Sequence, residues 1–439
     1  MSTRALRQQA SSKEGSLAVF LKSRLPRILY RLTMPGSLLL GIVLVLLRLG
    51  VVSESDARVL TLLPIGVFLI GLALCIAFRR SRLFFAMLAV TLSQTALALV
   101  VPRLSPHNAP IVANAIAILL PLNLLALAFL KERGIISPAG RRRLAMIAVQ
   151  ALAVTALCLP ALEPVVSLLD RTFMPEELSA WSHLSQPASA SFALALLVIM
   201  VPLIRRYRAV ESSLLWTLVA SFMAVRTGSA TPEAGLYFAA GGMVLIVALL
   251  ETSYRMAYHD ELTQLPSRRA LNEALLKLPA DYTIAMIDVD HFKRFNDSFG
   301  HDAGDQALRL VASRLSHIAG GGRAYRYGGE EFAVVFPGKT AADVVLYLDR
   351  MRKVIEQSTF IVRGRERRGK RRVGRSARQE THVTVSIGVA ASNGEHVAPA
   401  DVMRIADKAL YRAKARGRNC TVNAKGTAAV PTMSLADAF

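Results

Sequence analysis

The pattern of apolar and polar positions divides the chain into two halves of different character. Up to about residue 250, long apolar runs are separated by short polar segments rich in arginine and lysine. Beyond that point, short apolar runs alternate with segments in which apolar residues recur every three or four positions. The first pattern is typical of membrane-spanning helices, and the second is typical of a soluble domain that contains both strands and helices.

Eight of the apolar runs are candidate membrane spans. They cover residues 35–52, 59–78, 83–101, 109–130, 144–162, 188–204, 213–225 and 235–250. Most of them approach the roughly 20 residues that a helix needs to cross a bilayer, although the seventh is short and weakly apolar. We therefore expect residues 34–250 to form an all-α transmembrane bundle of about eight helices.

The soluble half predicts an α+β domain. The expected strands are 282–289, 324–327, 332–336 and 381–391, and the expected helices are 271–278, 305–318, 341–357 and 399–415. Apart from the first and last helices, the order is β-α-β-β-α-β, which is that of a ferredoxin-like sandwich. Residues 251–259 contain neither proline nor glycine, so the last span is predicted to continue as a helical connector into this domain.

Composition and charge support a membrane protein. Apolar residues make up 53% of the chain, and 53 basic residues against 31 acidic ones give a net charge of +22. Eighteen basic residues lie before the first span and in alternate loops, whereas the other loops carry only Arg58, Arg103, Arg171 and Arg226. Because cytoplasmic loops collect positive charge, both termini are predicted to be cytoplasmic and the segment 163–187 external. Much of the charge excess is thus a topology signal, and nucleic acid is not an expected partner.

A glycine pair with two carboxylates stands between two predicted strands of the soluble half. The stretch reads Arg326-Tyr327-Gly328-Gly329-Glu330-Glu331-Phe332. Glycine lets a ligand approach the backbone closely, and carboxylate oxygens are the ligands that Mg²⁺ prefers. A tight hairpin with two solvated glutamates is the alternative for these residues taken alone.

More candidate chemistry follows the strand 282–289. Asp288 and Asp290 form an acidic pair that can hold Mg²⁺, and Lys293 can neutralise a phosphate. Further along, Asn296 and Asp305 can read a purine edge, because a carboxylate accepts from the N1–H and N2–H₂ groups of guanine. Near the C-terminus, cationic side chains that could reach a triphosphate are those of Lys414 and Arg418.

In combination, these motifs closely resemble the GGDEF-type diguanylate cyclases, in the variant with glutamate in place of the aspartate. The matching motifs are Asp260-Glu261-Leu262-Thr263-Gln264-Leu265, Asp288-Val289-Asp290-His291-Phe292-Lys293, Asn296-Asp297, Gly300-His301-Asp302-Ala303-Gly304-Asp305, Arg326 to Phe332, Val385-Ser386-Ile387-Gly388-Val389 and Ala406-Asp407-Lys408-Ala409-Leu410-Tyr411. The resemblance implies a nucleotidyltransferase that condenses two GTP molecules, held by the two subunits of a homodimer, into cyclic di-GMP and pyrophosphate. It also implies Mg²⁺, with Mn²⁺ as a substitute, and downstream effectors that bind cyclic di-GMP.

The resemblance implies a role for each site residue. The catalytic residue is Glu330, and the metal ligands are Asp288, the backbone carbonyl of Val289, Glu330 and Glu331. The substrate-binding residues are Asn296, His301, Asp305, Lys293, Lys414 and Arg418. The product-inhibition site of the family, Arg-x-x-Asp, is expected to be absent, because Ala319-Gly320-Gly321-Gly322 stands in its place.

The expected organisation is a basic cytoplasmic segment (1–33), a transmembrane sensor region (34–250), the helical connector (251–259), the catalytic domain (260–424) and a flexible tail (425–439). The expected location is the bacterial inner membrane, with the catalytic domain in the cytoplasm. The stretch 363–378, with nine basic residues and one glutamate, is predicted to be a solvated loop, with contact to nucleic acid or anionic lipid as the alternative. Two other hypotheses stay open: a degenerate domain that binds GTP without making product, and a transporter with an attached cyclase.

Overall fold

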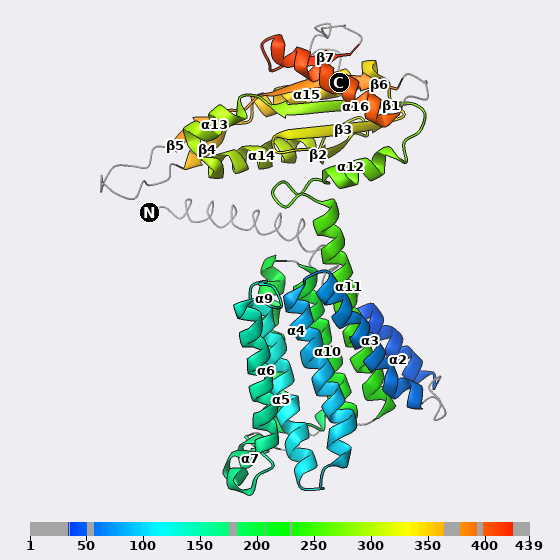
Figure 1. Cartoon of the computed structure of the whole chain (residues 1–439), viewed down its shortest axis with the longest axis vertical. Helices are drawn as coiled ribbons and strands as arrows, with labels where there is room; N and C mark the ends of the chain where they lie inside the picture. Colours follow the sequence, from blue (N-terminus) through cyan, green and yellow to red (C-terminus); the bar gives the residue numbers. More distant parts are fainter. Residues whose placement is uncertain are drawn as a thin grey trace, which may run out of the picture. The chain divides into compact units, whose positions relative to one another are not determined.

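The structure, a computed structural model, describes residues 34, 36–50, 57–173, 175, 182–206, 208–228, 231–363, 378–392 and 398–424. The chain divides into two units, Met1–Ser253 and Tyr254–Phe439 (Figure 1). The predicted segments 1–33 and 425–439 lie outside the described residues, as do most of the basic stretch 363–378 and residues 176–181.

The first unit is a bundle of helices. They are α2 (Gly36–Arg48), α3 (Ala57–Ala77), α4 (Ser81–Thr95), α5 (Asn108–Phe129), α6 (Pro138–Ala156), α7 (Glu163–Leu169), α9 (Gln186–Arg206), α10 (Ala209–Thr227) and α11 (Pro232–Tyr258). A π turn and a 3₁₀ turn extend α4 to Arg103. The predicted all-α character is therefore confirmed for this unit, and α11 continues as a helix through most of the connector.

The predicted count of about eight spans is not confirmed. Each predicted span overlaps a helix, but five of the described helices are long and apolar enough to cross a membrane, or six if the pair formed by α6 and the bent segment Pro160–Leu169 counts as one span. Helix α2 has 13 residues and is short for a span, whereas α3 has 21 residues. The weak seventh span, in contrast, is a 19-residue helix, α10.

A buried ion pair explains why the beginning of α10 was missed. Glu211, whose side chain is fully buried, faces Arg82 at the start of α4, with Nη1 3.3 Å from Oε1. Nε of Arg82 also donates to the carbonyl of Leu127 at 3.0 Å. Charges buried in this way are tolerated when they are paired and hydrogen-bonded, so the helix can start at polar residues.

The second unit is built on a five-stranded sheet in the order β2-β3-β1-β6-β7 (Figure 1). The strands are β1 (Tyr282–Val289), β2 (Arg323–Arg326), β3 (Glu331–Pro337), β6 (Val385–Ala391) and β7 (Thr421–Asn423). Strand β1 pairs antiparallel with β3 and β6, β2 pairs antiparallel with β3, and β7 pairs parallel with β6. The first four strands follow the predicted β-α-β-β-α-β order. Strand β7 and a separate hairpin, β4 (Phe360–Arg363) with β5 (Arg378–Thr381), were not predicted.

Helices cover both faces of this sheet. They are α12 (Arg268–Leu275), α13 (Phe292–Phe299), α14 (His301–Leu315), α15 (Ala341–Glu356) and α16 (Pro399–Ala415). Alternate residues of β1 enter different cores: Ala285 and Ile287 pack with α14 and α15, whereas Ile284 and Met286 pack with α12 and α16. This alternation is the period of two that a strand imposes, and it makes the unit an α+β sandwich.

Helix α16 lies directly on β6 at one glycine. A Cβ atom added to Gly388 would lie 2.1 Å from the backbone nitrogen of Leu410 and 2.2 Å from the carbonyl oxygen of Ala406. No side chain larger than hydrogen fits there without moving the helix. Gly388 therefore sets the distance between the strand and the helix that carries Lys414.

Candidate active site

The end of β1 brings an acidic side chain to α16. Asp288 continues the alternation of Ile284 and Met286, so it points to the same face of the sheet as that helix. Its Oδ2 lies 2.9 Å from Nζ of Lys414, and the Asp288 side chain is only 7% exposed. On the neighbouring strand Glu331 is the register partner of Asp288, and the backbone N–H of Val289 donates to the carbonyl of Glu330 at 3.3 Å. Sheet pairing thus brings together two motifs that lie far apart in the sequence.

A cavity of roughly 370 Å³ opens at this strand end. Six of the ten predicted site residues line it: Asp288, Val289, Lys293, Glu330, Lys414 and Arg418. The lining also includes His291, Phe292, Arg294 and Asp297, which sequence reasoning did not single out for the site. A concave surface with three carboxylates and several cations suits a ligand that carries both phosphates and a bound metal ion.

Burial makes the ionised forms of Asp288 and Glu330 less stable than they are in water. Burial raises the pKa of Asp288, and Lys414 opposes that rise. Burial also raises the pKa of Glu330, where the negative charges of Asp288 and Glu331 add to the effect and Lys414 opposes it. Because the pKa of each carboxyl group is raised, a further positive charge would stabilise the ionised carboxylates.

The donors present fit a hard divalent cation. Asp288 and Glu330 supply carboxylate oxygens, the backbone of Val289 supplies a carbonyl oxygen, and Mg²⁺ prefers such ligands. No three His, Cys, Asp or Glu side chains within the described ranges already converge as a metal cluster. In this structure the Asp288 carboxylate forms an ion pair with Nζ of Lys414.

The remaining predicted site residues do not line the cavity. The Glu331 side chain lies against Gly328, because a Cβ added to that glycine would be 2.6 Å from the Glu331 Oε2. Asn296 lies on α13, and His301 and Asp305 lie on α14, two helices that contact one another. His301 is exposed and Asp305 is half-buried. The predicted nucleotide-binding residues therefore form a second group beside the cavity.

Asn296 in this second group has a buried acceptor. Its Oδ1 is buried and has no hydrogen-bond partner within the described part of the chain. A Cβ added to Gly304 would lie 1.9 Å from that oxygen, so the glycine makes room for the amide. A buried acceptor left without a donor costs free energy, which makes Asn296 a good candidate for a group that a ligand satisfies.

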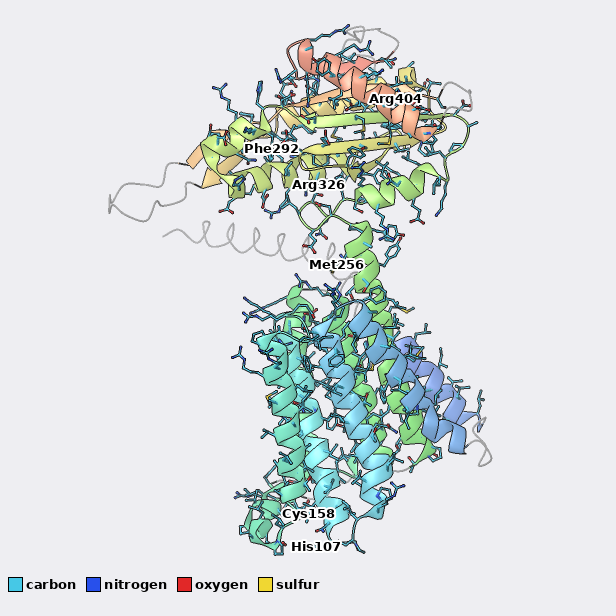
Figure 2. All side chains as sticks on the ribbon, in the orientation of Figure 1. His107, Cys158, Met256, Phe292, Arg326 and Arg404 are labelled. Atoms are coloured by element: carbon cyan, nitrogen blue, oxygen red, sulfur yellow. The ribbon has the colours of Figure 1, made fainter. Side chains whose placement is uncertain are left out.

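Arg326, labelled in Figure 2, holds the glycine turn, and sequence reasoning missed this role. Its Nε donates to the carbonyl of Gly328 at 3.1 Å, and its Nη2 donates to the carbonyl of Gly329 at 2.6 Å. Its Nη1 lies 2.7 Å from Oδ1 of Asp260, which also accepts the backbone N–H of Thr263. One guanidinium therefore ties the turn before Glu330 to the beginning of the soluble unit, and the matching Asp260 motif was the signal that could have indicated it.

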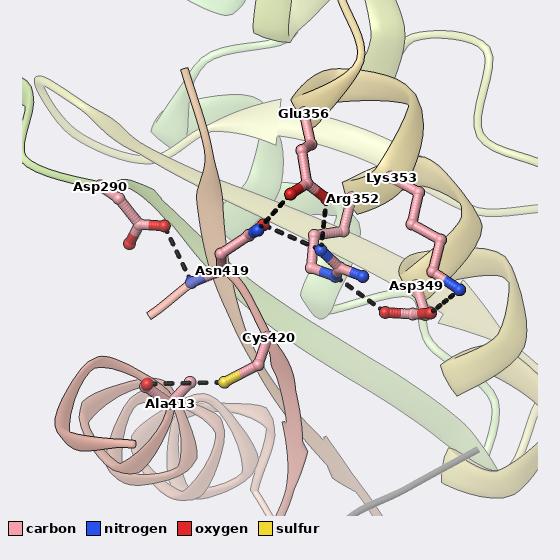
Figure 3. Close-up of polar contacts among 8 residues, drawn as sticks. All are labelled: Asp290, Asp349, Arg352, Lys353, Glu356, Ala413, Asn419 and Cys420. Carbon is pink, nitrogen blue, oxygen red and sulfur yellow. Dashed lines mark hydrogen bonds and ion pairs between the residues drawn. The ribbon is translucent and has the colours of Figure 1, made fainter. Parts of the chain in front are cut away.

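Of the two aspartates in the acidic pair, Asp290 is engaged in hydrogen bonds inside the protein and is not among the predicted metal ligands. Its Oδ1 accepts from the Ser386 hydroxyl at 2.6 Å, and its Oδ2 accepts from the Thr384 hydroxyl at 2.8 Å. The same Oδ2 accepts the backbone N–H of Asn419 at 3.0 Å (Figure 3). Both oxygens are thus used inside the protein, at the start of β6 and on the loop that follows α16.

A network of charged groups fixes that loop further (Figure 3). Oδ1 of Asn419 accepts from Nη1 of Arg352 at 2.9 Å, and Nδ2 of Asn419 donates to Glu356 at 2.8 Å. Three consecutive residues of the turn, Gly417 to Asn419, have positive φ. Non-glycine residues adopt such angles only when the surroundings hold them there. The network therefore positions Arg418, which lines the cavity.

Comparisons with known proteins agree on the soluble half. Residues 257–420 match the family model described as diguanylate cyclase, GGDEF domain. The response regulator PleD of Caulobacter vibrioides is 38% identical over 181 residues, which is 39% of this chain and 37% of PleD. The probable diguanylate cyclase DgcF of Escherichia coli is 33% identical over 213 residues, which is 46% of this chain and 63% of DgcF.

Solved structures are also similar to part of this chain. One of them is the GGDEF domain of DgcB from Caulobacter crescentus in complex with c-di-GMP, which is 35% identical and aligns with a TM-score of 0.34. The alignment covers 39% of this chain and 94% of that chain.

Proposed function

We propose that this chain, whose residues 257–420 form a GGDEF domain, is a membrane-bound diguanylate cyclase of the GGEEF variant that condenses two GTP molecules into cyclic di-GMP. The observation that carries the proposal is the cavity in which Asp288, Glu330, Lys414 and Arg418 meet. In the reaction the 3′-hydroxyl oxygen of each GTP bonds to the α-phosphorus of the other. Each α–β phosphoanhydride bond breaks, and each pyrophosphate leaves with its electron pair.

The residues of the cavity would divide this work. Asp288, Glu330 and the carbonyl of Val289 would hold Mg²⁺ or Mn²⁺, with assistance from Glu331. When bound, such an ion neutralises negative charge on the phosphate oxygens. Glu330, whose pKa is raised by burial, is a better proton acceptor than an exposed glutamate and would take the proton of the attacking hydroxyl.

The other predicted residues would bind the nucleotide. Lys293, Lys414 and Arg418 would contact the phosphates, and Lys414 would leave Asp288 to do so. Asn296 and Asp305 would bind the guanine edge together with His301, and the unpartnered Oδ1 of Asn296 supports this part of the proposal. One cavity offers room for one triphosphate, so a homodimer with two facing cavities is proposed for the condensation.

The test of the proposed function is product analysis. The full chain and a fragment covering residues 254–439 are each incubated with GTP and Mg²⁺, and the nucleotides are separated by chromatography. Formation of cyclic di-GMP and pyrophosphate supports a cyclase. Saturable GTP binding without product would instead favour the degenerate domain that senses GTP.

The apolar helices support a location in the bacterial inner membrane. A cysteine placed at the exposed His183 in a Cys158→Ser background is expected to react with an impermeant maleimide in spheroplasts, because the segment 163–187 is proposed to be external. A cysteine at the exposed Lys339 of the soluble unit serves as the control and is expected to react only after lysis. Labelling at Lys339 but not at His183 in sealed cells would overturn this orientation.

The product is expected not to inhibit its own synthesis through the family's usual site. Gly320 and Gly321 have φ angles of 76° and 77°, and a Cβ added to Gly322 would lie 2.5 Å from the Phe336 ring. The turn therefore offers neither the arginine nor the aspartate of Arg-x-x-Asp. Losing both contacts of a two-point site costs several kcal/mol, so about 10 μM cyclic di-GMP should change the initial rate by less than about twofold. Strong non-competitive inhibition at low micromolar product would reveal a second site.

A further inference from the structure

The first unit contains a basic cavity that the proposed cyclase does not use. It has a volume of roughly 470 Å³ and lies where α5 ends and α6 begins. Four cationic side chains line it: Lys131, Arg133, Arg142 and Arg143. Its lining contains no acidic residue within the described part of the chain. Four positive charges around one concave surface indicate a site for an anion.

Arg143 shows that the site is built into the fold. Arg143 is only 8% exposed. Its Nη2 donates to the carbonyl of Lys131 at 2.8 Å, and its guanidinium carbon lies 5.7 Å from the centre of the Phe85 ring. Its Nη1 is buried and finds no hydrogen-bond acceptor among the described residues. A buried guanidinium N–H without an acceptor is costly, and a phosphate oxygen would satisfy it.

The carboxylate of Glu132 offsets part of this charge but is held outside the cavity. Glu132 stands between Lys131 and Arg133 in the sequence, but its Oε1 accepts from the Ser81 hydroxyl at 2.7 Å and from the backbone N–H of Arg82 at 3.1 Å. Glu132 is thus engaged with the start of α4 and does not line the cavity.

Apolar side chains in the cavity favour a lipid phosphate over a soluble phosphate. Phe129 and Met146 line the same cavity and are 49% and 44% exposed, respectively. A soluble phosphate has no apolar group that could cover these side chains, whereas a phospholipid carries a phosphate joined to acyl chains. The loop between α5 and α6 is also one of the arginine-rich loops predicted to be cytoplasmic, where a membrane-facing cavity would meet the headgroups of the inner leaflet.

We propose that this cavity binds the phosphate of an anionic phospholipid, with the acyl chains against Phe129 and Met146. The inference rests on the proposed membrane location but not on the cyclase activity. Binding there would join the ends of α5 and α6 through the lipid headgroup, and so make the sensor region responsive to the anionic lipid content of the membrane.

The test measures lipid retained by the full chain in an uncharged detergent. Native mass spectrometry is expected to find phosphatidylglycerol retained in preference to phosphatidylcholine. Arg133→Gln with Arg142→Gln should lower that retention by about tenfold or more, because two phosphate-binding charges are lost. Both side chains are exposed, so the variant should fold. The matched control is Arg141→Gln: Arg141 is also exposed and adjacent in sequence but does not line the cavity, and its loss should change retention by less than about twofold.

Three results would overturn the proposal. They are equal retention of the two lipids, an equal loss in the Arg141→Gln control, and displacement of phosphatidylglycerol by millimolar inorganic phosphate or glycerol phosphate. The last would assign the same cations to a soluble phosphate instead. Cyclic di-GMP synthesis is assayed on the same samples, so failure of the lipid site and failure of the proposed cyclase give separate results.

Discussion

Asp288→Asn is expected to lower the rate of cyclic di-GMP formation by at least about 100-fold while the soluble unit stays folded. The carboxylate lies at the end of β1, is almost fully buried, and faces the cavity together with Glu330. An amide has the same shape but carries no charge, so it would weaken the hold on a divalent cation and leave Lys414 without its partner. Several kcal/mol of transition-state stabilisation should be lost. Initial rates with GTP and Mg²⁺ measure the effect, and Glu330→Gln should behave alike.

An aspartate just before the other end of the same strand provides the control. Asp281 directly precedes the other end of β1 and is exposed, and its Asp→Asn variant should retain the wild-type rate. Thermal unfolding of both variants shows whether the fold is intact. Near-normal turnover by folded Asp288→Asn would refute the proposed metal ligation.

Gly388→Ala is expected to lower the free energy of unfolding of the soluble unit by about 3 kcal/mol. The new methyl group would overlap the backbone of α16 at Ala406 and Leu410, and backbone atoms cannot move aside as the end of a flexible side chain can. The helix must shift away from β6, which opens the core that contains Ile284 and Met286. Urea unfolding of residues 254–439 measures the loss.

Gly329→Ala is the matched control for this stability measurement. A Cβ atom at Gly329 would have no heavy atom within 4 Å, and its φ angle is not positive. Its free energy of unfolding should therefore stay within about 0.5 kcal/mol of the wild-type value. Equal stability of the Gly388→Ala and Gly329→Ala variants would mean that α16 does not pack on β6 as described.

The regular elements with strong patterns could be predicted from the sequence. Strand β1 and helix α16 were predicted residue for residue, because one is a continuous apolar run and the other begins at a proline. Helix α13 was missed. It starts after His291, which has a left-handed backbone with φ 54°. Glycine would have indicated such a conformation, but histidine does not. Strand β7 has only three residues and is defined by its pairing with β6. A pairing between segments far apart in the sequence cannot be predicted from a local pattern of residues.

The first unit and the candidate site also have features that the sequence could not predict. A run of apolar residues predicts a helix well, but not whether a 13-residue helix such as α2 crosses a bilayer. In the site, the residue types indicated metal and phosphate chemistry, and the structure gathers six of the ten predicted residues in one cavity. The residue types alone could not separate Asp288 from Asp290. The family resemblance named only Asp288 as a metal ligand, and the structure adds that Asp290 binds the loop at Asn419.

That difference between Asp288 and Asp290 matters for how a mutational scan of this chain is interpreted. Activity alone would score the two positions as equally essential. At one of them the defect would be chemical, and at the other it would be architectural, because without Asp290 the loop carrying Arg418 loses an anchor at Asn419. An activity assay shows which positions matter. A second measurement of the structure is needed to distinguish a chemical defect from an architectural one.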